Sequence, residues 1–335
     1  MSRPYFTSRP VRWGIIGCGD VTEVKSGPAY RQTEGFRLAA VMRRDEAKVK
    51  DYARRHGVDK YTTDADALIN DPDIDAVYIA TPPDTHRLYG LKVVAAGKPC
   101  CIEKPLAPSY GDSRAISEAF DRAGVPLFVA YYRRSLPRFE RVKAWLQEGA
   151  IGTVRHVSLQ LCKPPGPPDR SGAPNWRTDP AVAPGGYFDD LASHGLDLLT
   201  YYLGNITSVH GISLNQQGLY GAKDAVTACW VHDTGATGTG SWNFGTGEAL
   251  DQVEIFGSAG TIRFSVFDDQ ALVLERDGRR SETFLEHPAT VQLPHVENMA
   301  RDLLGNGDYV HPSTGASATH VSWVMDRILG TLPLV

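Results

Sequence analysis

The sequence has few cysteines and no pattern that would make them a scaffold. Of its 335 residues five are cysteine, an odd number, and no two stand at CxxC spacing. A disulfide framework and a zinc site built on cysteine pairs are therefore excluded. We predict reduced thiols in a cytoplasmic protein.

Long apolar runs are also missing. No stretch approaches the roughly 20 residues that a transmembrane helix needs. Residues 1–10 contain two arginines and two prolines and lack the apolar core of a secretory signal. We therefore expect no membrane anchor and no membrane partner.

Charge of one sign is not in excess. The 35 Lys and Arg residues against 39 Asp and Glu give a net charge of −4, and hydrophobic residues make up 42%. This composition is typical of a globular protein and does not favour a nucleic-acid partner. The length predicts two domains of roughly 100–200 residues each.

Strand-like and helix-like segments alternate over residues 11–130. The apolar runs are VRWGII, FRLAAVM, DAVYIA, KPCCIE and VPLFVA, and helical periodicity covers residues 45–56, 84–96 and 109–123. Continuous apolar runs are typical of parallel strands that are covered on both faces. We predict an α/β first domain, residues 1–130, with the doubly wound parallel sheet of a Rossmann fold.

The periodicity changes after residue 130. Residues 137–149 favour a helix and 153–161 a strand, and the proline-rich KPPGPPDRSGAP favours a loop. Hairpin signals at HDTG, FGSAG and ERDG predict an antiparallel meander over residues 206–285. Residues 294–329 return to helical periodicity and are expected to pack on that sheet. The second domain, residues 131–335, is thus predicted to be α+β, built on a large, mostly antiparallel sheet.

A glycine turn follows the first predicted strand. In GIIGCGDVT, Gly17 and Gly19 take the first two positions of a GxGxxG turn and Thr22 takes the third. Without side chains there, backbone N–H groups and the next helix N-terminus can approach a pyrophosphate, with Asp20 and Val21 alongside. Its place between a strand and a helix favours dinucleotide binding over a purely steric corner.

The end of the second strand, AVMRRDEAK, bears on the choice of dinucleotide. An acidic residue there would bind the ribose of NAD, and an arginine would bind the 2′-phosphate of NADP. Arg43 stands at the strand tip with Arg44 behind it. We predict NADP, with NAD as the alternative if the pair is merely solvated. Asp45 is expected to cap the following helix.

Two further strand ends carry ATPPDTHR and CCIEKPLAP. Ligands bind at the carboxyl ends of strands in a doubly wound sheet. Lys104 at this edge could hydrogen-bond a substrate oxygen, and the alternative is an ordinary surface lysine. His86 either orients a cofactor or packs against the sheet.

The segment GGYFDDLASHGLDLL places Asp190 and His194 four residues apart on a predicted helix, so they share one face. Histidine exchanges a proton near neutral pH, and a neighbouring carboxylate can fix its tautomer, which alcohol oxidation requires. A structural pair is the alternative. A metal site is disfavoured because no HxxxH or CxxC partner accompanies the pair, so no metal is predicted. Asp189 and Asp197 are expected to be cap or surface groups.

Together, GIIGCG, ATPPDTH, EKP and the block NWRTDP to GGYFDDLASHGLD resemble the Gfo/Idh/MocA family, over nearly the whole chain. The resemblance implies that Lys104 binds the reacting oxygen, with Glu103 and a cis Pro105 positioning it. His194 would be the acid or base and Asp190 its partner. Whether Lys104 or His194 moves the proton stays open.

The motifs and the resemblance together give the expected ligand contacts. The cofactor residues would be Gly17, Gly19, Asp20, Val21, Thr22, Arg43, Arg44, Thr81, Pro82, Pro83, His86, Glu103, Lys104, Trp176 and Arg177. The substrate residues would be Tyr132, Arg133, Trp176 and His194, although Tyr132 falls where the family often has asparagine. A homodimer or homotetramer is implied through an open sheet face, a role that would suit strands bearing Trp230 and Trp242.

The sequence thus predicts hydride transfer between NAD(P) and a secondary alcohol or ketone of a sugar, cyclitol or related polyol. Two alternatives remain. One is a regulator that senses a dinucleotide or sugar without catalysis, and the other is a glycosidase or lyase with permanently bound nicotinamide. The EKP motif and the Asp190/His194 pair favour the enzyme.

Overall fold

The apolar runs of the first 130 residues form a six-stranded parallel sheet in the computed structural model, which describes residues 5–7, 10–305 and 307–332. The expectation about a signal segment falls partly on residues 1–4 and 8–9, outside the described residues. The strand order β3-β2-β1-β4-β5-β6 is that of a dinucleotide-binding sheet and confirms the prediction. The strands are β1 (Val11–Ile16), β2 (Phe36–Met42), β3 (Lys60–Thr62), β4 (Ala76–Ile79), β5 (Cys100–Ile102) and β6 (Leu127–Val129).

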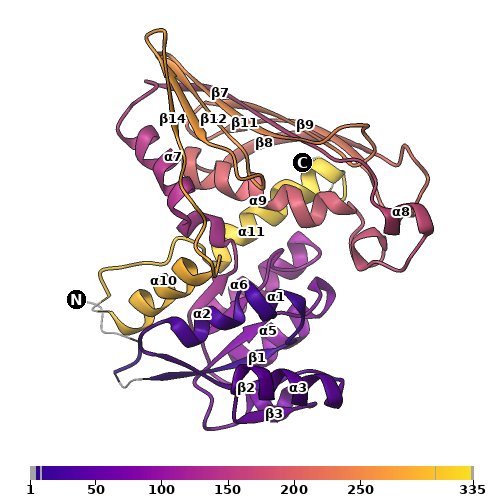
Figure 1. Cartoon of the computed structure of the whole chain (residues 1–335), viewed down its shortest axis with the longest axis vertical. Coiled ribbons are helices and arrows are strands. Elements are labelled where there is room, and N and C mark those ends of the chain that lie inside the picture. Colours follow the sequence, from indigo (N-terminus) through magenta and orange to yellow (C-terminus); the bar gives the residue numbers. More distant parts are fainter. Residues whose placement is uncertain (1–4, 8–9, 306, 333–335) are drawn as a thin grey trace. The chain divides into compact units, whose positions relative to one another are not determined.

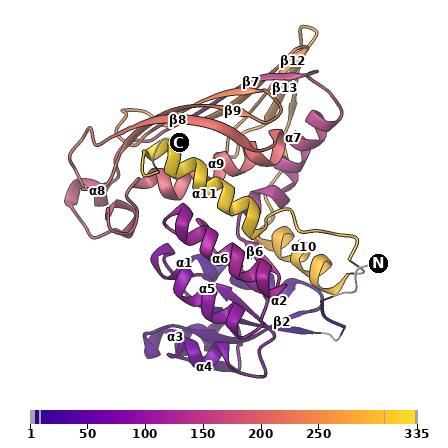
Figure 2. The ribbon, with the colours of Figure 1, turned by 180° about the vertical axis from the view of Figure 1, so that it is seen from behind.

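Helices cover this sheet, and every residue of β4, β5 and β6 is buried (Figures 1 and 2). The three predicted helices are present to within a few residues, whereas β3 and α4 were not predicted. Asp45 caps α3 by accepting the Lys48 N–H at 3.0 Å, as expected. The helices are α1 (Asp20–Val24), α2 (Gly27–Gln32), α3 (Glu46–His56), α4 (Ala65–Ile69), η1 (Pro83–Thr85), α5 (His86–Ala95), α6 (Tyr110–Ala123) and η2 (Tyr132–Ser135).

The chain divides into two units, and the first includes a segment from near the C-terminus. It comprises Met1–Ala107, Gly111–Leu136 and Pro288–Thr319. Helix α10 (Leu293–Leu304) lies beside α2 (Figures 1 and 2), and its Val296 and Met299 join the core around Trp13. The prediction that this helix packs on the large sheet is therefore wrong, and the first unit extends beyond the boundary placed at residue 130. Helical periodicity reveals an apolar face but not what covers it.

The second unit comprises Pro108–Tyr110, Pro137–His287 and His320–Val335. Its eight-stranded sheet has the order β14-β13-β12-β11-β7-β10-β9-β8 and is antiparallel except where β10 pairs with β7. The strands are β7 (Val154–Cys162), β8 (Ile206–Leu214), β9 (Ala225–His232), β10 (Thr237–Asn243), β11 (Leu250–Gly257), β12 (Gly260–Phe264), β13 (Leu272–Arg276) and β14 (Arg279–Thr283).

The three predicted hairpins are confirmed, but the simple meander is not. Strand β7 enters the sheet between β10 and β11, which are consecutive in the chain. In the last hairpin, Asp277 and Gly278 both have positive φ, 53° and 70°, as a tight two-residue turn requires. A hairpin signal identifies sequence neighbours that pair, and it does not tell which distant strand lies between two hairpins.

Helices α9 and α11 lie along one face of the large sheet, as Figure 2 shows. Gly195 of α9 allows close approach to β7, because a Cβ there would lie 2.5 Å from Leu159 Cδ1. Gly211 of β8 does the same for α11, whose Ile328 carbonyl oxygen would lie 2.4 Å from an added Cβ. The helices of this unit are α7 (Pro137–Gln147), α8 (Pro167–Ser171), η3 (Trp176–Thr178), α9 (Tyr187–Leu203) and α11 (Gly315–Leu329). Helix α8 occupies the stretch predicted as a loop.

Trp230 and Trp242 point to the helix-covered face rather than to the open one. Their exposed fractions are 3% and 0%, and Trp242 meets Phe188 of α9 edge to face at 5.0 Å. The residues on either side of Trp230 in the strand, Cys229 and Val231, face outward. Strand alternation places these two tryptophans in the core, and the expected role of their strands in subunit contacts stays a prediction.

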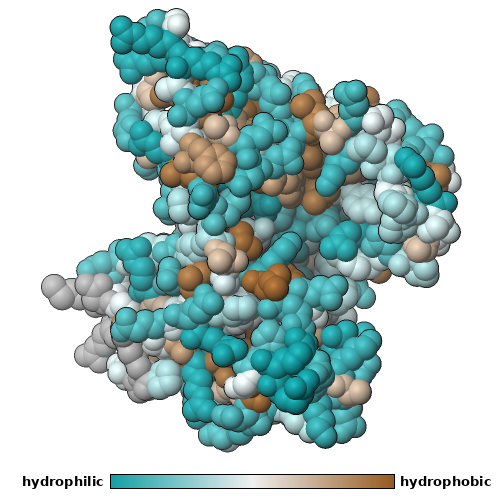
Figure 3. Space-filling model, viewed as in Figure 1, coloured by the Kyte–Doolittle hydropathy of each residue, from teal (hydrophilic) through white to brown (hydrophobic). Residues whose placement is uncertain are grey.

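The face of the molecule seen in the space-filling view (Figure 3) is mainly polar. Figure 3 shows hydrophilic residues over most of the visible face, with apolar residues in small separate patches. In the described part of the chain, no helix combines the length and apolar character needed to span a bilayer.

Candidate active site

The glycine turn after β1 has a backbone geometry that glycine allows. Gly17 has a φ of 91°, and a Cβ there would lie 2.6 Å from Thr81 Cγ2. A Cβ at Gly19 would have only the Gly17 carbonyl within 4 Å, at 3.9 Å, so the turn leaves open space there. The first N–H groups of α1, which begins at Asp20, lack acceptors within the helix. The turn can thus present N–H groups to an anion.

Thr22, at the third position of the motif, faces inward. Its side chain is fully buried and its hydroxyl donates to the Gly19 carbonyl at 2.8 Å. Its own carbonyl accepts the hydroxyl of Tyr52 in α3, at 2.9 Å. Thr22 therefore holds the shape of the turn through its hydroxyl and its carbonyl, and its expected place beside the cofactor stays a prediction.

An ion pair also joins α1 to α3. Arg55 donates to both carboxylate oxygens of Glu23 at 2.7 Å, and His56 Nε2 lies 2.8 Å from the same carboxylate. The hydrogen bonds from Arg55 lower the pKa of Glu23 to about 2. Sequence reasoning missed Glu23, Tyr52 and Arg55, since no local pattern pairs residues that lie about 30 positions apart in sequence.

An arginine at the end of β2 contacts the glycine turn. Arg43 is half-buried and donates from Nη1 to the Cys18 carbonyl at 3.1 Å, whereas Arg44 is exposed. Burial raises the pKa of the Cys18 thiol to about 11, so it is not a reactive thiolate at neutral pH. The carboxylate of Asp45 is engaged in capping α3.

His86 joins the two loops at the ends of β4 and β5. Its ring is fully buried, with Nε2 2.8 Å from the Thr81 carbonyl and Nδ1 3.0 Å from the Pro105 carbonyl. Of the TPP turn, Thr81 and Pro82 reach the surface and Pro83 is buried. His86 and Pro83 are thus placed to support the turn, and their contact with a cofactor stays a prediction.

Glu103 anchors the backbone of Lys104. It is 8% exposed, and Oε1 accepts the Tyr78 hydroxyl at 2.6 Å and Gln292 Nε2 at 2.9 Å. Oε2 accepts the Lys104 N–H at 3.2 Å, and the Lys104–Pro105 peptide bond is cis, as the resemblance implied. Lys104 is half-buried at the end of β5. Tyr78 and Gln292 were missed, although a tyrosine inside a buried strand signals a polar partner.

Tyr132 and Arg133 form a local pair in η2. Arg133 donates from Nη1 to the Tyr132 hydroxyl at 2.9 Å, and its guanidinium lies 5.0 Å from the ring centre. Arg133 is buried while Tyr132 is half-buried. Tyr132 is thus the more accessible of the two expected substrate contacts.

The second unit holds Asp190 and His194 on one face of α9. His194 is 4% exposed and meets Phe267 edge to face at 5.6 Å. Asp190 accepts the Nε of Arg177 at 2.6 Å, and Arg177 stacks over Trp176 at 4.4 Å. Sequence reasoning named both charged residues but did not pair them, because they lie in different elements.

Of Asp189 and Asp197, which were expected to be cap or surface groups, only Asp189 behaves as expected. Asp189 accepts the Gly185 N–H at 2.8 Å, as a cap does, and burial raises its pKa to about 7. Asp197 is 1% exposed, so its expected place on the surface is wrong. In the described residues, no three His, Cys, Asp or Glu side chains group to hold a metal ion.

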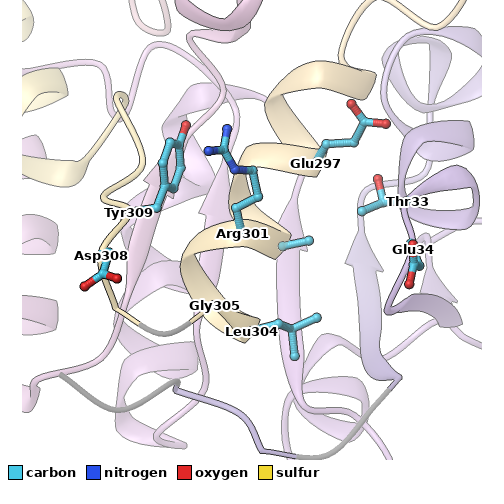
Figure 4. A pocket seen from close by; sticks show the side chains of 9 residues that line it. Thr33, Glu34, Glu297, Arg301, Leu304, Gly305, Asp308 and Tyr309 are labelled. Carbon is cyan, nitrogen blue, oxygen red and sulfur yellow. The ribbon is translucent and has the colours of Figure 1, made fainter. Parts of the chain in front are cut away.

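A separate pocket lies in the first unit. It measures about 620 Å³, and Figure 4 shows the Arg301 side chain beside the Tyr309 ring, 4.1 Å apart by guanidinium carbon and ring centre. Its lining residues are Thr33, Glu34, Glu297, Ala300, Arg301, Leu304, Gly305, Asp308 and Tyr309. None of the candidate residues belongs to it, so this pocket is not the predicted site.

Two family models cover most of the chain. The model described as "Oxidoreductase family, NAD-binding Rossmann fold" matches residues 11–131. The model "GFO/IDH/MocA C-terminal domain" matches residues 139–263. The chain belongs to the Gfo/Idh/MocA oxidoreductase family. The resemblance seen in the motifs is confirmed, and the first unit carries the family's NAD-binding domain.

Relatives of this Gfo/Idh/MocA oxidoreductase extend the match. It is 37% identical over 322 residues to an oxidoreductase of Formosa agariphila, covering 96% of this chain and 99% of the relative. It is 27% identical over 289 residues to a D-apiose dehydrogenase of Paraburkholderia graminis, covering 84% and 74%. A structure of levoglucosan dehydrogenase with NADH and levoglucosan superposes with a TM-score of 0.81 at 22% identity, covering 95% and 96%, and shares the fold.

Proposed function

We propose that this Gfo/Idh/MocA protein transfers a hydride between NADP and a secondary alcohol or ketone of a sugar, cyclitol or related polyol. The observation that carries the proposal is the Glu103 network, which anchors the Lys104 backbone at the carboxyl end of β5. The apiose dehydrogenase among its relatives and the levoglucosan-bound structure support a carbohydrate substrate.

The first unit fits a dinucleotide. Gly17 allows the turn to pack closely against Thr81, Gly19 leaves space that a side chain would fill, and the N–H groups of Asp20 and Val21 at the start of α1 suit a pyrophosphate. Thr81 and Pro82 line the neighbouring strand end. The bound nicotinamide would accept or supply the hydride.

The proposed preference for NADP rests on charge at the end of β2. Arg43 lies against the glycine turn and Arg44 is exposed beside it, so both can approach a 2′-phosphate. Asp45, the nearest acidic side chain in the sequence, is engaged by the Lys48 N–H and is less able to bind ribose hydroxyls. A guanidinium forms charge-assisted hydrogen bonds to phosphate that NAD cannot offer.

The proton is handled by Lys104, Asp190 and His194. The Lys104 ammonium would donate a hydrogen bond to the reacting oxygen, stabilising the charge that develops there. His194 would accept the hydroxyl proton during oxidation, and Asp190 on the same helical face would hold its orientation. Trp176 and Tyr132 are proposed to contact the substrate, with Arg133 orienting Tyr132 and Arg177 orienting Asp190.

We also propose a cytoplasmic homodimer or homotetramer. Support comes from the open face of the eight-stranded sheet, where Ile212 is 68% and Leu214 50% exposed. Light scattering coupled to size exclusion would measure the assembly.

A screen of sugars and polyols, monitored by the absorbance of reduced nicotinamide, tests the proposed function. We expect turnover of added NADP with at least one substrate. Dinucleotide binding without turnover would favour the regulator. Tightly retained nicotinamide with glycosidic cleavage and no net turnover of added NADP would favour the glycosidase or lyase.

A further inference from the structure

A cavity of about 280 Å³ lies within the second unit, beside the start of α9. Its volume is near the lower end of ligand pockets, roughly 300 Å³, and suits a single sugar ring. The lining residues are Lys163, Pro164, Gly166, Asp169, Tyr187, Asp190, Leu191 and Phe244. The cavity thus includes Asp190 of the candidate site and three apolar side chains that can pack on the C–H face of a sugar.

The two carboxylates of the cavity are already engaged. Asp169 accepts the Gly166 N–H at 2.7 Å through one oxygen and the Tyr187 hydroxyl at 2.7 Å through the other. Asp190 accepts Arg177 Nε at 2.6 Å. Because these carboxylates are already satisfied by donors from the protein, neither is well placed to bind a cation from the substrate.

Hydrogen bonds also fix the loop that forms one wall. Tyr187, the first residue of α9, accepts Asn175 Nδ2 at 3.1 Å in addition to donating to Asp169. Asn175 Oδ1 accepts the Arg177 N–H at 3.1 Å. The Arg177 side chain in turn donates to Asp190 of α9. The chain of bonds starts and ends on one helix, so the wall is preorganised.

Lys163 is the one charged lining residue whose side chain is not engaged. It follows β7, its backbone N–H is bound by the Asn243 carbonyl at 2.9 Å, and its side chain is exposed. Among the described residues, its ammonium forms no ion pair. Lys163 is therefore the lining side chain whose charge is available to an anionic group of a ligand.

We propose that this cavity is a substrate subsite for a sugar acid and that Lys163 binds the carboxylate of that acid. The proposal rests on the proposed function and names the class of its substrate. The apolar wall of Pro164, Leu191 and Phe244 would hold the ring, and the ammonium would supply a charge-assisted hydrogen bond that a neutral sugar cannot accept as strongly.

Calorimetric titration of the NADP-loaded protein compares D-glucuronate and D-galacturonate with their uncharged methyl esters. We expect at least one acid to bind roughly tenfold more tightly than its ester, since the ester keeps the ring and loses the charge. Lys163→Met should abolish that difference, and Lys163→Arg should retain most of it. Lys50→Met, which removes an exposed charge from α3, is the matched control and should leave it unchanged. Melting curves check that each variant is folded.

Equal binding of acid and ester, no binding of either acid, or an acid preference that survives in Lys163→Met would overturn the sugar-acid subsite. Hydride transfer with a neutral polyol alone would also overturn it while leaving the proposed function intact. Acid binding that depends on Lys163, with no hydride transfer to or from any substrate, would instead overturn the proposed function.

Discussion

Arg177 and Asp190 form an ion pair, with 2.6 Å between Nε and Oδ2. The pair joins the loop of residues 175–177 to the first turn of α9. The Asp190 side chain is 13% exposed and that of Arg177 39%, so solvent screens the pair only in part. The acidic member of the predicted proton-handling pair is thus held on one side by an arginine. This relationship links the shape of the loop to the chemistry proposed for His194.

Asp190 and His194 are predicted to act as one unit. His194→Ala should lower kcat by roughly 10²–10⁴-fold, and Asp190→Ala should cost nearly as much, with the double variant resembling His194→Ala. Steady-state kinetics of the three proteins test this. Losses that multiply would show that the shared helical face carries no functional coupling. Arg177→Met, which leaves both groups in place, should have a smaller effect than either single variant.

Tyr52 is predicted to position the dinucleotide turn. Tyr52→Phe removes the hydroxyl that binds the Thr22 carbonyl, leaving a buried acceptor without its donor at a cost of about 1–3 kcal/mol. Fluorescence titration should show NADP affinity reduced roughly fivefold or more. The matched control, Tyr5→Phe, loses an exposed hydroxyl bond to Gly97 and should bind normally. Unchanged affinity in Tyr52→Phe would show that α1 does not depend on this bond.

The fold and part of the site follow from local patterns. Strands β1 and β2 coincide with the predicted apolar runs, and Gly17 and Asp45 behave as their motifs imply. Local patterns do not predict which sheet face is covered or which distant side chains pair. Alternation along β9 and β10 puts Trp230 and Trp242 on a definite face, but the sequence does not say which face is covered. The pairing of Arg177 with Asp190 and of Glu103 with Gln292 depends on packing between segments far apart in the chain.

Two buried histidines predict a loss of stability in acid. Burial lowers the pKa of His311 to about 4 and that of His295 well below its usual value. His311 accepts the Ser313 N–H and its Nε2 lies 3.2 Å from the His295 carbonyl, an arrangement of a neutral ring. Since the unfolded chain binds a proton near pH 6.5, stability is full above that pH. It falls as the pH drops toward 4, by about 1.4 kcal/mol per unit for each histidine.

Thermal midpoints at about pH 7.5 and about pH 5 measure this loss. His295→Leu removes one titrating group from the core of the first unit and should lose less stability between the two pH values than the unmodified protein. An identical loss in both proteins would show that other groups control the acid transition.

Arg43 is predicted to set the choice of cofactor. Its contact with the 2′-phosphate should give at least about tenfold higher kcat/KM with NADP than with NAD. Arg43→Asp should reverse the preference, because a carboxylate repels the phosphate and accepts the ribose hydroxyl. Arg44→Ala, a change at the exposed neighbour, should have a smaller effect. Equal or better use of NAD by the unmodified enzyme would mean that Arg43 does not contact the phosphate.

The most direct test of the account is the rate of nicotinamide reduction with a responsive polyol, measured for the unmodified enzyme and for Lys104→Ala. We expect Lys104→Ala to bind NADP with near-normal affinity and to turn over roughly 10²–10⁴-fold more slowly, because the glycine turn is intact while the group that contacts the reacting oxygen is lost. Near-normal turnover by Lys104→Ala would contradict the account, since it would remove Lys104 from the chemistry that the Glu103 network is proposed to support.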